Sequence, residues 1–325
     1  MYDCFMDEKI WQMFIFGTGE YLDEALSKGL GGVIFFTRDI DSKAQFGKLI
    51  NTIIKKSLIT PFLSIDQEGG RVERTEKIHP RYLSPRYAYQ KGQKFLKEQT
   101  EAIAKELKEY GINLNFAPCA DVNTNPKNPI IGERAFSDKT SDVIDGVKIV
   151  SEIYRQSGII PCVKHYPGHG DADKDSHLTL PQIDLPLDEM ERIHIAPFKC
   201  AIENGIEMIM AAHLHCTCFD KDVLPASLSQ NAIGYLRDKL NYNGVIISDD
   251  MVMKGVQDYG SLEAVIMGIK AGLDMFIFRD ADKNAYTTVE KLIKEVKNDK
   301  VLQKCVENSF ERIKLLKSKI KGCDC

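Results

Sequence analysis

The stretch IIPCVKHYPGHGDADKDSH (159–177) carries the pattern that decides the fold. A short apolar run leads into lysine and histidine, and a loop rich in glycine and aspartate follows. Because the run is continuously apolar, it predicts a strand that is buried on both faces, as parallel strands between helices are. The polar residues after it lie where the carboxyl end of that strand is expected.

The same pattern recurs along the whole chain and predicts eight strands. These are MFIFG (13–17), GGVIFF (31–36), PFLSID (61–66), INLNFAP (112–118), IIPCVKHY (159–166), EMIMAAH (207–213), GVIISDD (244–250) and DMFIF (274–278). Amphipathic segments rich in Lys and Glu separate them and are expected to be helical. They cover 19–28, 42–57, 92–109, 140–157, 188–203, 229–240, 260–271 and 284–297, with a terminal helix near 301–320.

Eight strand-and-helix units predict an α/β fold of the (β/α)₈ TIM-barrel type, with residues 1–325 forming a single domain. A doubly wound open sheet is the alternative. Such a sheet would carry a GxGxxG fingerprint after an early strand, and the sequence has none.

Composition narrows the class of ligand and the compartment. Lys+Arg total 43 and Asp+Glu 47, a formal net charge of −4 without a strongly basic block, so no nucleic acid or anionic membrane is expected as a partner. The first residues contain neither a basic n-region nor a small-residue cleavage site, so no secretory signal is expected, and no apolar run approaches the ~18–20 residues that span a bilayer. Nine irregularly spaced cysteines argue against a disulfide framework and favour the reducing cytoplasm.

In a barrel of this type the active site lies at the carboxyl ends of the strands, and polar residues gather at those positions here. Asp66 ends the third predicted strand, and Lys164 with His165 ends the fifth. His213 ends the sixth, where a role in lining the site is plausible, whereas His215 is expected in a loop. Asp249 and Asp250 end the seventh.

The loop at 164–177 suits two chemistries. His165, His169 and His177 could bind zinc or iron together with the neighbouring aspartates. Alternatively, Asp175 and His177 form a proton-transfer dyad, in which the carboxylate orients the imidazole and raises its basicity. The residues of the loop leave both possibilities open.

Asp249 favours the second chemistry. Its carboxylate follows the apolar strand GVIIS and would face the barrel mouth, which suits a nucleophile that attacks a sugar anomeric carbon. The alternative role for an aspartate at this position is a helix N-cap. We assign the cap to Ser248 or Asp250 and the chemistry to Asp249, although spacing does not exclude the reverse.

Five blocks stand at intervals along a stretch that spans nearly the whole chain, from about residue 8 to residue 280. They are IDQEGGRVER (65–74), NFAPCADVNTNPKNPIIGERAFS (115–137), KHYPGHGDADKDSHLTLP (164–181), PASLSQNAIGYLRDKLNYNGVIISDDM (225–251) and AGLDMFIF (271–278). In this order they resemble the signature blocks of family 3 glycoside hydrolases, and in particular the single-domain bacterial β-N-acetylhexosaminidases. The second domain that many family members carry is not expected here.

The resemblance implies roles at the matching positions. Asp249 corresponds to the nucleophile and His177 to the acid/base, with Asp175 orienting it; the histidine replaces the second carboxylate of the general glycosidase pattern. The residues that match sugar-binding positions are Asp66, Arg74, Arg134, Lys164 and His165. Taken without the blocks, Arg134 could pair only with Glu133 or another surface carboxylate, Arg74 could face solvent and Asp66 could cap a helix.

The resemblance therefore implies a retaining exo-β-N-acetylglucosaminidase without a metal or an organic cofactor. Its expected substrate is a saccharide or muropeptide in which N-acetylglucosamine is β-linked to 1,6-anhydro-N-acetylmuramic acid, which suits peptidoglycan recycling by a cytoplasmic monomer. A family 3 β-glucosidase and a glycoside phosphorylase are the alternatives with the same nucleophile. A metal-dependent barrel hydrolase built on the histidine loop is the alternative from another class.

Overall fold

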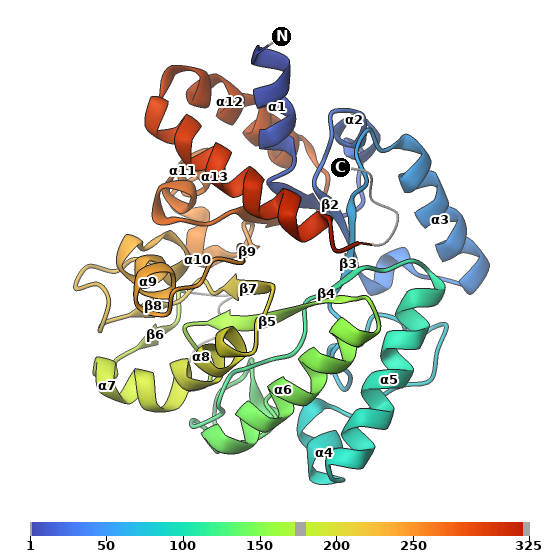
Figure 1. The fold of residues 1–325 in the computed structure, drawn as a ribbon, viewed down its shortest axis with the longest axis vertical. Helices are drawn as coiled ribbons and strands as arrows, with labels where there is room; N and C mark the ends of the chain where they lie inside the picture. The colour runs from blue at the N-terminus through green and yellow to red at the C-terminus, as the bar shows by residue number, and fades with distance from the viewer. Residues whose placement is uncertain (1, 173–179, 321–325) are drawn as a thin grey trace.

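The computed structural model describes residues 2–172 and 180–320, in which eight parallel strands close into a barrel (Figure 1). Around the barrel the order is β1-β10-β9-β7-β5-β4-β3-β2. The strands are β1 (Phe14–Phe16), β2 (Gly32–Phe35), β3 (Phe62–Ile65), β4 (Leu114–Asn115), β5 (Ile160–Tyr166), β7 (Met208–Ala211), β9 (Val245–Asp250) and β10 (Met275–Phe278). The (β/α)₈ prediction and all eight predicted strands are confirmed, and the open-sheet alternative is wrong.

Helices surround the strands where the amphipathic segments predict them (Figure 1). They are α2 (Leu22–Ser27), α3 (Lys43–Lys56), α5 (Gln93–Glu109), α6 (Thr140–Gln156), α7 (Leu187–Met190), α8 (Ala196–Glu203), α9 (Gln230–Gly234), α11 (Ser261–Ala271), α12 (Lys283–Asn298) and α13 (Lys300–Lys317). π-Helical turns follow α7 at Glu191–Ile195 and α9 at Tyr235–Lys239. None of the described helices combines the length and the apolar character that crossing a membrane requires.

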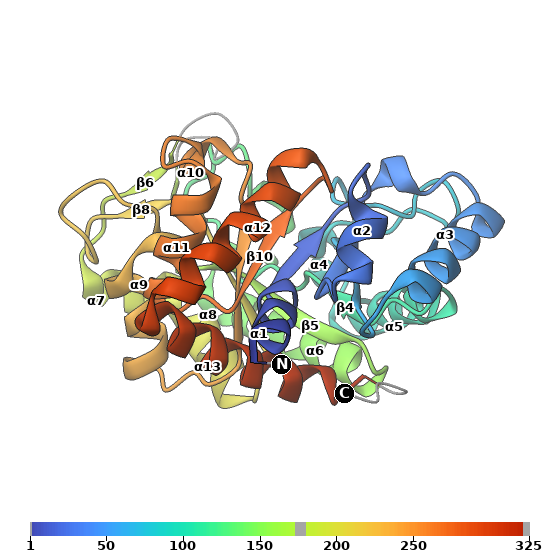
Figure 2. The ribbon, with the colours of Figure 1, turned by 90° about the horizontal axis from the view of Figure 1, so that it is seen from above.

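The sequence did not predict three helices and one small sheet. The helices are α1 (Tyr2–Trp11), α4 (Pro85–Gln90) and α10 (Lys254–Gln257). Helix α1 packs against α12 and α13, so the first and last helices lie together outside the barrel (Figure 2). Strands β6 (Gln182–Ile183) and β8 (His215–Cys216) form a separate two-stranded parallel sheet.

The barrel closes where β1, near the start of the chain, pairs with β10, near its end. Phe14 lies in register with Phe276, and Phe16 with Phe278. The ring centroids of these pairs are 5.7 Å and 5.9 Å apart, within the range of favourable aromatic contact. Aromatic packing therefore supports the backbone pairing that joins the two ends of the sheet.

A buried aspartate anchors the start of β10. Asp274 is fully buried, and its Oδ2 accepts the backbone N–H of Ile246 at 2.9 Å and a hydrogen bond from Arg237. Its Oδ1 accepts from the Ser309 hydroxyl at 2.9 Å and from Arg312 Nη1 at 3.0 Å. One carboxylate therefore holds β9, the turn after α9, and α13 against β10.

We expect Asp274→Ala to lower the free energy of unfolding by about 3–5 kcal/mol, because it leaves two half-buried arginines and the buried Ile246 N–H without this acceptor. Urea unfolding at neutral pH measures this effect. The control is Asp222→Ala, which removes an exposed aspartate and should change the stability by less than about 0.5 kcal/mol. Equal losses in the two variants would contradict the anchoring role of Asp274.

Candidate active site

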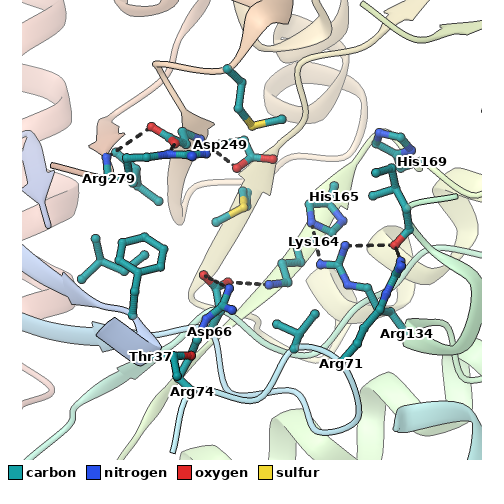
Figure 3. Close-up of a pocket in the computed structure, with 18 of the residues that line it drawn as sticks. Thr37, Asp66, Arg71, Arg74, Arg134, Lys164, His165, His169, Asp249 and Arg279 are labelled. Carbon is teal, nitrogen blue, oxygen red and sulfur yellow. Dashed lines mark hydrogen bonds and ion pairs between the residues drawn. The ribbon is translucent and has the colours of Figure 1, made fainter. Parts of the chain in front are cut away.

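A cavity of about 610 Å³ opens at the carboxyl ends of the barrel strands (Figure 3). Six of the eight predicted site residues line it: Asp66, Arg74, Arg134, Lys164, His165 and Asp249. They come from the ends of β3, β5 and β9 and from the loops after β3 and β4. The other two, Asp175 and His177, lie outside the described residues. The barrel thus brings every described member of the predicted site to one cavity.

Lys164 lines the cavity from β5, although the residue is only 1% exposed. Its Nζ lies 2.6 Å from Asp66 Oδ1 and 2.6 Å from Glu68 Oε1. Burial alone would lower the pKa of Lys164, but the two carboxylates raise it above its ordinary value. Lys164 therefore stays a cation, and Asp66 accepts a hydrogen bond from it instead of capping a helix.

Glu68 also binds Arg134, in a two-pronged ion pair. Arg134 lies in the 3₁₀ turn Gly132–Arg134, and its Nε and Nη2 donate to Glu68 at 3.0 Å and 2.8 Å. Burial alone would raise the pKa of Glu68, but Arg134 and Lys164 hold it far below its usual range. The partner of Arg134 is thus Glu68 and not Glu133. The sequence analysis missed Glu68, although it stands within the first matching block.

A tight turn after β3 places the arginines of the same block. Gly69 and Gly70 have φ of +96° and +63°, a region that disfavours other residues. A Cβ at Gly69 would lie 2.4 Å from the Leu83 carbonyl oxygen, so the close approach also requires glycine. After this turn Arg74 returns to the cavity, where its Nη2 lies 3.7 Å from Asp66 Oδ2. Arg74 is therefore half-buried at the site and does not face bulk solvent.

The two aspartates at the end of β9 have different partners. Asp250 binds the Arg279 side chain, and its Oδ1 accepts from the backbone of Val252 at 3.2 Å. Burial raises the pKa of Asp250 even so. Helix α10 begins at Lys254, with Met253 at its N-cap position, so the predicted cap by Ser248 or Asp250 is wrong.

Asp249 lies across the cavity from Asp66 and Lys164 (Figure 3). Its Oδ1 accepts the backbone N–H of Asp250 at 2.7 Å, and no described cation forms an ion pair with it. Burial alone would raise the pKa of Asp249, but His165, His213 and this hydrogen bond lower it below its ordinary value. Within residues 2–172 and 180–320, Asp249 therefore presents an ionised carboxylate to the cavity with no cation in an ion pair with it.

His165 is held in one orientation by Asp121, which the sequence analysis also missed. Its Nδ1 lies 2.7 Å from Asp121 Oδ2, and its Nε2 lies 3.3 Å from Arg134 Nη2. An ionised carboxylate only accepts and a guanidinium only donates, so Nδ1 carries the proton and Nε2 accepts. Burial would raise the pKa of Asp121, but His165 and His169 lower it far below its usual range. The signal for Asp121 was its place within the second matching block.

The other histidines differ in burial and partners. His213 is buried at the end of β7; its Nδ1 contacts the Ser227 hydroxyl at 2.7 Å, and it is not among the residues that line the cavity. The predicted lining role for His213 is therefore wrong. His215 lies in β8 and is buried, so the prediction of a loop histidine is also wrong.

His169 lines the cavity with a buried, neutral imidazole. It is 2% exposed, and neither ring nitrogen has a hydrogen-bond partner among residues 2–172 and 180–320. Burial lowers the pKa of His169 from 6.5 to about 4. In the unfolded chain the His169 imidazole therefore takes up a proton below about pH 6.5, whereas in the folded chain it does so only near pH 4.

His169 should accordingly reduce stability as the pH falls through this window. We expect the free energy of unfolding of the wild type to fall by about 3 kcal/mol more between pH 7 and pH 4 than that of His169→Gln, which has no titrating imidazole. Urea unfolding of both proteins across this range measures the difference. Parallel pH profiles would contradict the lowered pKa.

Comparison with known proteins identifies the family of the chain. Residues 5–316 match the family described as the glycosyl hydrolase family 3 N-terminal domain. A β-hexosaminidase A of Pseudoalteromonas piscicida is 31% identical over 92% of this chain, which spans only 55% of that relative. A β-hexosaminidase of Photobacterium profundum is 34% identical, over 81% of this chain and 78% of the relative.

A solved structure is also similar. It is a glycoside hydrolase family 3 β-N-acetylglucosaminidase from a Paenibacillus species, with a TM-score of 0.91 and 28% identity. The match covers 96% of this chain and 62% of that one. The family resemblance of the sequence blocks is thereby confirmed: the chain belongs to glycosyl hydrolase family 3.

Proposed function

We propose that the chain is a retaining exo-β-N-acetylglucosaminidase that acts through a covalent glycosyl-enzyme intermediate. The observation that carries the proposal is the ionised Asp249 carboxylate, which faces Asp66 and Lys164 across a cavity. Family membership and the activities for which the relatives are named support this class of substrate.

In the proposed first step, an Asp249 oxygen attacks the anomeric carbon and the bond to the leaving oxygen breaks. His177 gives its proton to that oxygen, and Asp175 orients the imidazole. In the second step His177 takes a proton from water, the water oxygen attacks the anomeric carbon, and Asp249 leaves as a carboxylate. Two inversions at one carbon give net retention.

The proposed sugar-binding residues are already held in place. Asp66 can accept hydroxyl hydrogen bonds, and Lys164 and Arg134 can donate them, while Glu68 and Asp66 fix the two cations. Groups that are oriented before the ligand arrives lose little freedom on binding. This supports the assignment of Asp66, Arg74, Arg134, Lys164 and His165 to the sugar ring.

We also propose a muropeptide-derived leaving group, with peptidoglycan recycling by a cytoplasmic monomer as the setting. Arg71 lines the cavity and donates to the backbone carbonyls of Pro129 and Ile130, but forms no ion pair with a described carboxylate. Such a cation is free to attract a carboxylate on the leaving group.

A glycoside phosphorylase is the second candidate, because the same arginine would also attract phosphate and an imidazole acid/base does not repel an anion. Formation of a sugar 1-phosphate in phosphate buffer would identify this activity. Faster turnover of the 4-nitrophenyl glucoside than of the N-acetylglucosaminide would instead indicate a β-glucosidase.

The principal test is hydrolysis of 4-nitrophenyl N-acetyl-β-D-glucosaminide in the presence of EDTA. Asp249→Ala should lower kcat at least about 10³-fold, because the nucleophile is lost, and His177→Ala about 10²–10⁴-fold. Asp222→Ala is the control and should retain wild-type rates. Nuclear magnetic resonance should show the β-anomer as the first product. Activity that EDTA abolishes, or that survives Asp249→Ala, would contradict the proposal and favour a metal-dependent hydrolase.

Glu68 provides a test of the sugar-binding assignment. Glu68→Gln keeps the shape of the side chain but removes the charge that orients Arg134 and Lys164, so we expect KM to rise about tenfold or more with a smaller change in kcat. Steady-state kinetics with the same substrate measure the two constants. The matched control is Glu133→Gln beside Arg134, which should leave KM unchanged. Equal effects of the two variants would exclude this role of Glu68.

A further inference from the structure

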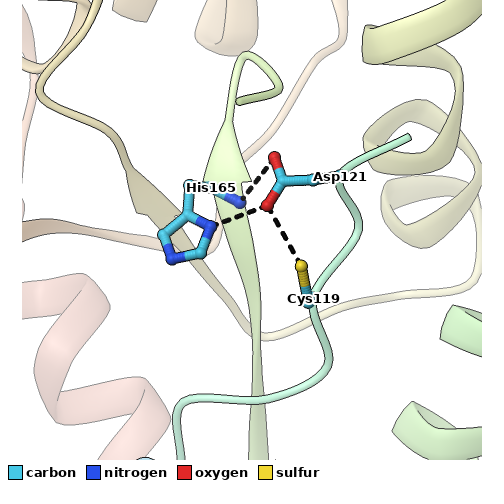
Figure 4. A group of neighbouring side chains, drawn as sticks. All are labelled: Cys119, Asp121 and His165. Carbon is cyan, nitrogen blue, oxygen red and sulfur yellow. Dashed lines mark hydrogen bonds and ion pairs between the residues drawn. The ribbon is translucent and has the colours of Figure 1, made fainter. Parts of the chain in front are cut away.

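Three potential metal ligands lie close together (Figure 4), and one of them, His165, also lines the cavity. Cys119 and Asp121 lie in the loop after β4, and His165 lies in β5. Asp121 Oδ2 lies 3.1 Å from Cys119 Sγ and 2.7 Å from His165 Nδ1, and all three donor atoms lie within 4.8 Å of one another. The three residues are buried, with exposures of 1%, 0% and 6% in chain order. We refer to them as the Cys119–Asp121–His165 cluster.

The chemistry of the donors selects a particular class of cation. A thiolate, a carboxylate and an imidazole suit Zn²⁺ or Cd²⁺, whereas Mg²⁺ and Ca²⁺ prefer oxygen ligands alone. Around tetrahedral Zn²⁺, with bonds of about 2.0–2.3 Å, such donors lie roughly 3.4–3.6 Å apart. The distances at Asp121 Oδ2 are shorter, so Cys119 Sγ and His165 Nδ1 must each move away from this oxygen by about half an ångström to admit the ion.

The backbone holds the two contributing segments together. The Ala120 N–H donates to the Lys164 carbonyl at 2.6 Å, and the Lys164 N–H donates to the Pro118 carbonyl at 3.2 Å. Asp121 Oδ1 accepts the backbone N–H of His169 at 2.6 Å, which fixes the carboxylate and leaves Oδ2 to face the cluster. A preformed arrangement of this kind reduces the cost of ordering ligands around an ion.

We propose that the Cys119–Asp121–His165 cluster binds one thiophilic divalent cation, Zn²⁺ or Cd²⁺, and that the bound cation inhibits the enzyme. The inhibition rests on the function proposed above, whereas the binding does not. The cation replaces the two hydrogen bonds that the Cys119 thiol and His165 Nδ1 donate to Asp121 Oδ2. Neither a change of oxidation state nor a co-reactant is involved.

The inhibition follows from the two protons that the cation displaces, one from the Cys119 thiol and one from His165 Nδ1. The thiol proton is released to solvent, and the imidazole proton moves from Nδ1 to Nε2. Nε2 then carries a hydrogen where it now accepts from Arg134 Nη2 at 3.3 Å, and two donors would face each other. The cation therefore displaces either the His165 ring or the Arg134 guanidinium from the cavity wall. Because binding releases one proton, a higher pH favours it.

The test is titration of the reduced full-length protein with CdCl₂, followed by the ultraviolet charge-transfer absorbance of cadmium thiolate and by glycoside hydrolysis. Cys119→Ser keeps a hydroxyl that can donate to Asp121 but removes the sulfur ligand. Cys162→Ala is the matched control, since it removes another fully buried cysteine of the same region, from β5. If Cys119→Ser does not fold, Cys119→Ala takes its place.

We expect the wild type and Cys162→Ala to bind one cadmium ion more than Cys119→Ser, and to be inhibited at cadmium concentrations at least about tenfold lower. Equal absorbance changes in wild type and Cys119→Ser would overturn the metal site, and the three residues would then form a hydrogen-bonded cluster only. If Cys119→Ser loses the absorbance change but is inhibited at the same cadmium concentration as the wild type, the coupling between the cluster and the cavity is overturned. The absorbance readout decides the binding even if the protein hydrolyses no glycoside.

Discussion

The burial of two cations at the barrel mouth, Lys164 and Arg134, is the constraint on which the rest of the site depends. Moving a charged group out of water costs several kcal/mol unless a partner of opposite charge comes with it. Glu68 is the shared partner of both cations, and Asp66 completes the neutralisation of Lys164. Arg134 and Glu68 are separated by 66 positions in the sequence, and Lys164 and Asp66 by 98. The loop after β3, the loop after β4 and the end of β5 must therefore meet for these contacts to form.

A separate ion pair, between Asp250 and Arg279, distinguishes the chemical roles of two adjacent aspartates. Asp250 is engaged by Arg279, and burial raises its pKa, whereas Asp249 has no described cationic partner and its pKa is lowered. A carboxylate already bound to arginine is a poor nucleophile, because its charge is neutralised and its oxygens are occupied. No described cavity residue neutralises Asp249 in an ion pair, so its charge remains available for a reacting atom.

Short polar clamps hold the segments that carry these groups. Asn115 binds Gln67 twice: its side-chain oxygen accepts the Gln67 N–H at 2.9 Å, and its side-chain amide donates to the Gln67 carbonyl at 2.9 Å. Asp121 acts similarly for β5, since it holds the His165 ring with one oxygen and the His169 backbone with the other. Buried polar residues beside the site thus hold the segments that carry the site side chains in fixed positions relative to the barrel strands.

The sequence by itself determined the barrel, the family and the strand ends at which polar residues gather, because apolar runs, amphipathic segments and signature blocks are local patterns. Only the tertiary structure decided partners: Glu68 rather than Glu133 for Arg134, and Asp121 for His165. It also decided that Asp250 is the aspartate of β9 that binds Arg279, whereas Asp249 forms no ion pair with any cation in the described part of the chain. Such choices depend on which loops meet across the barrel mouth, and the periodicity of a single segment contains no information about a contact with a distant one.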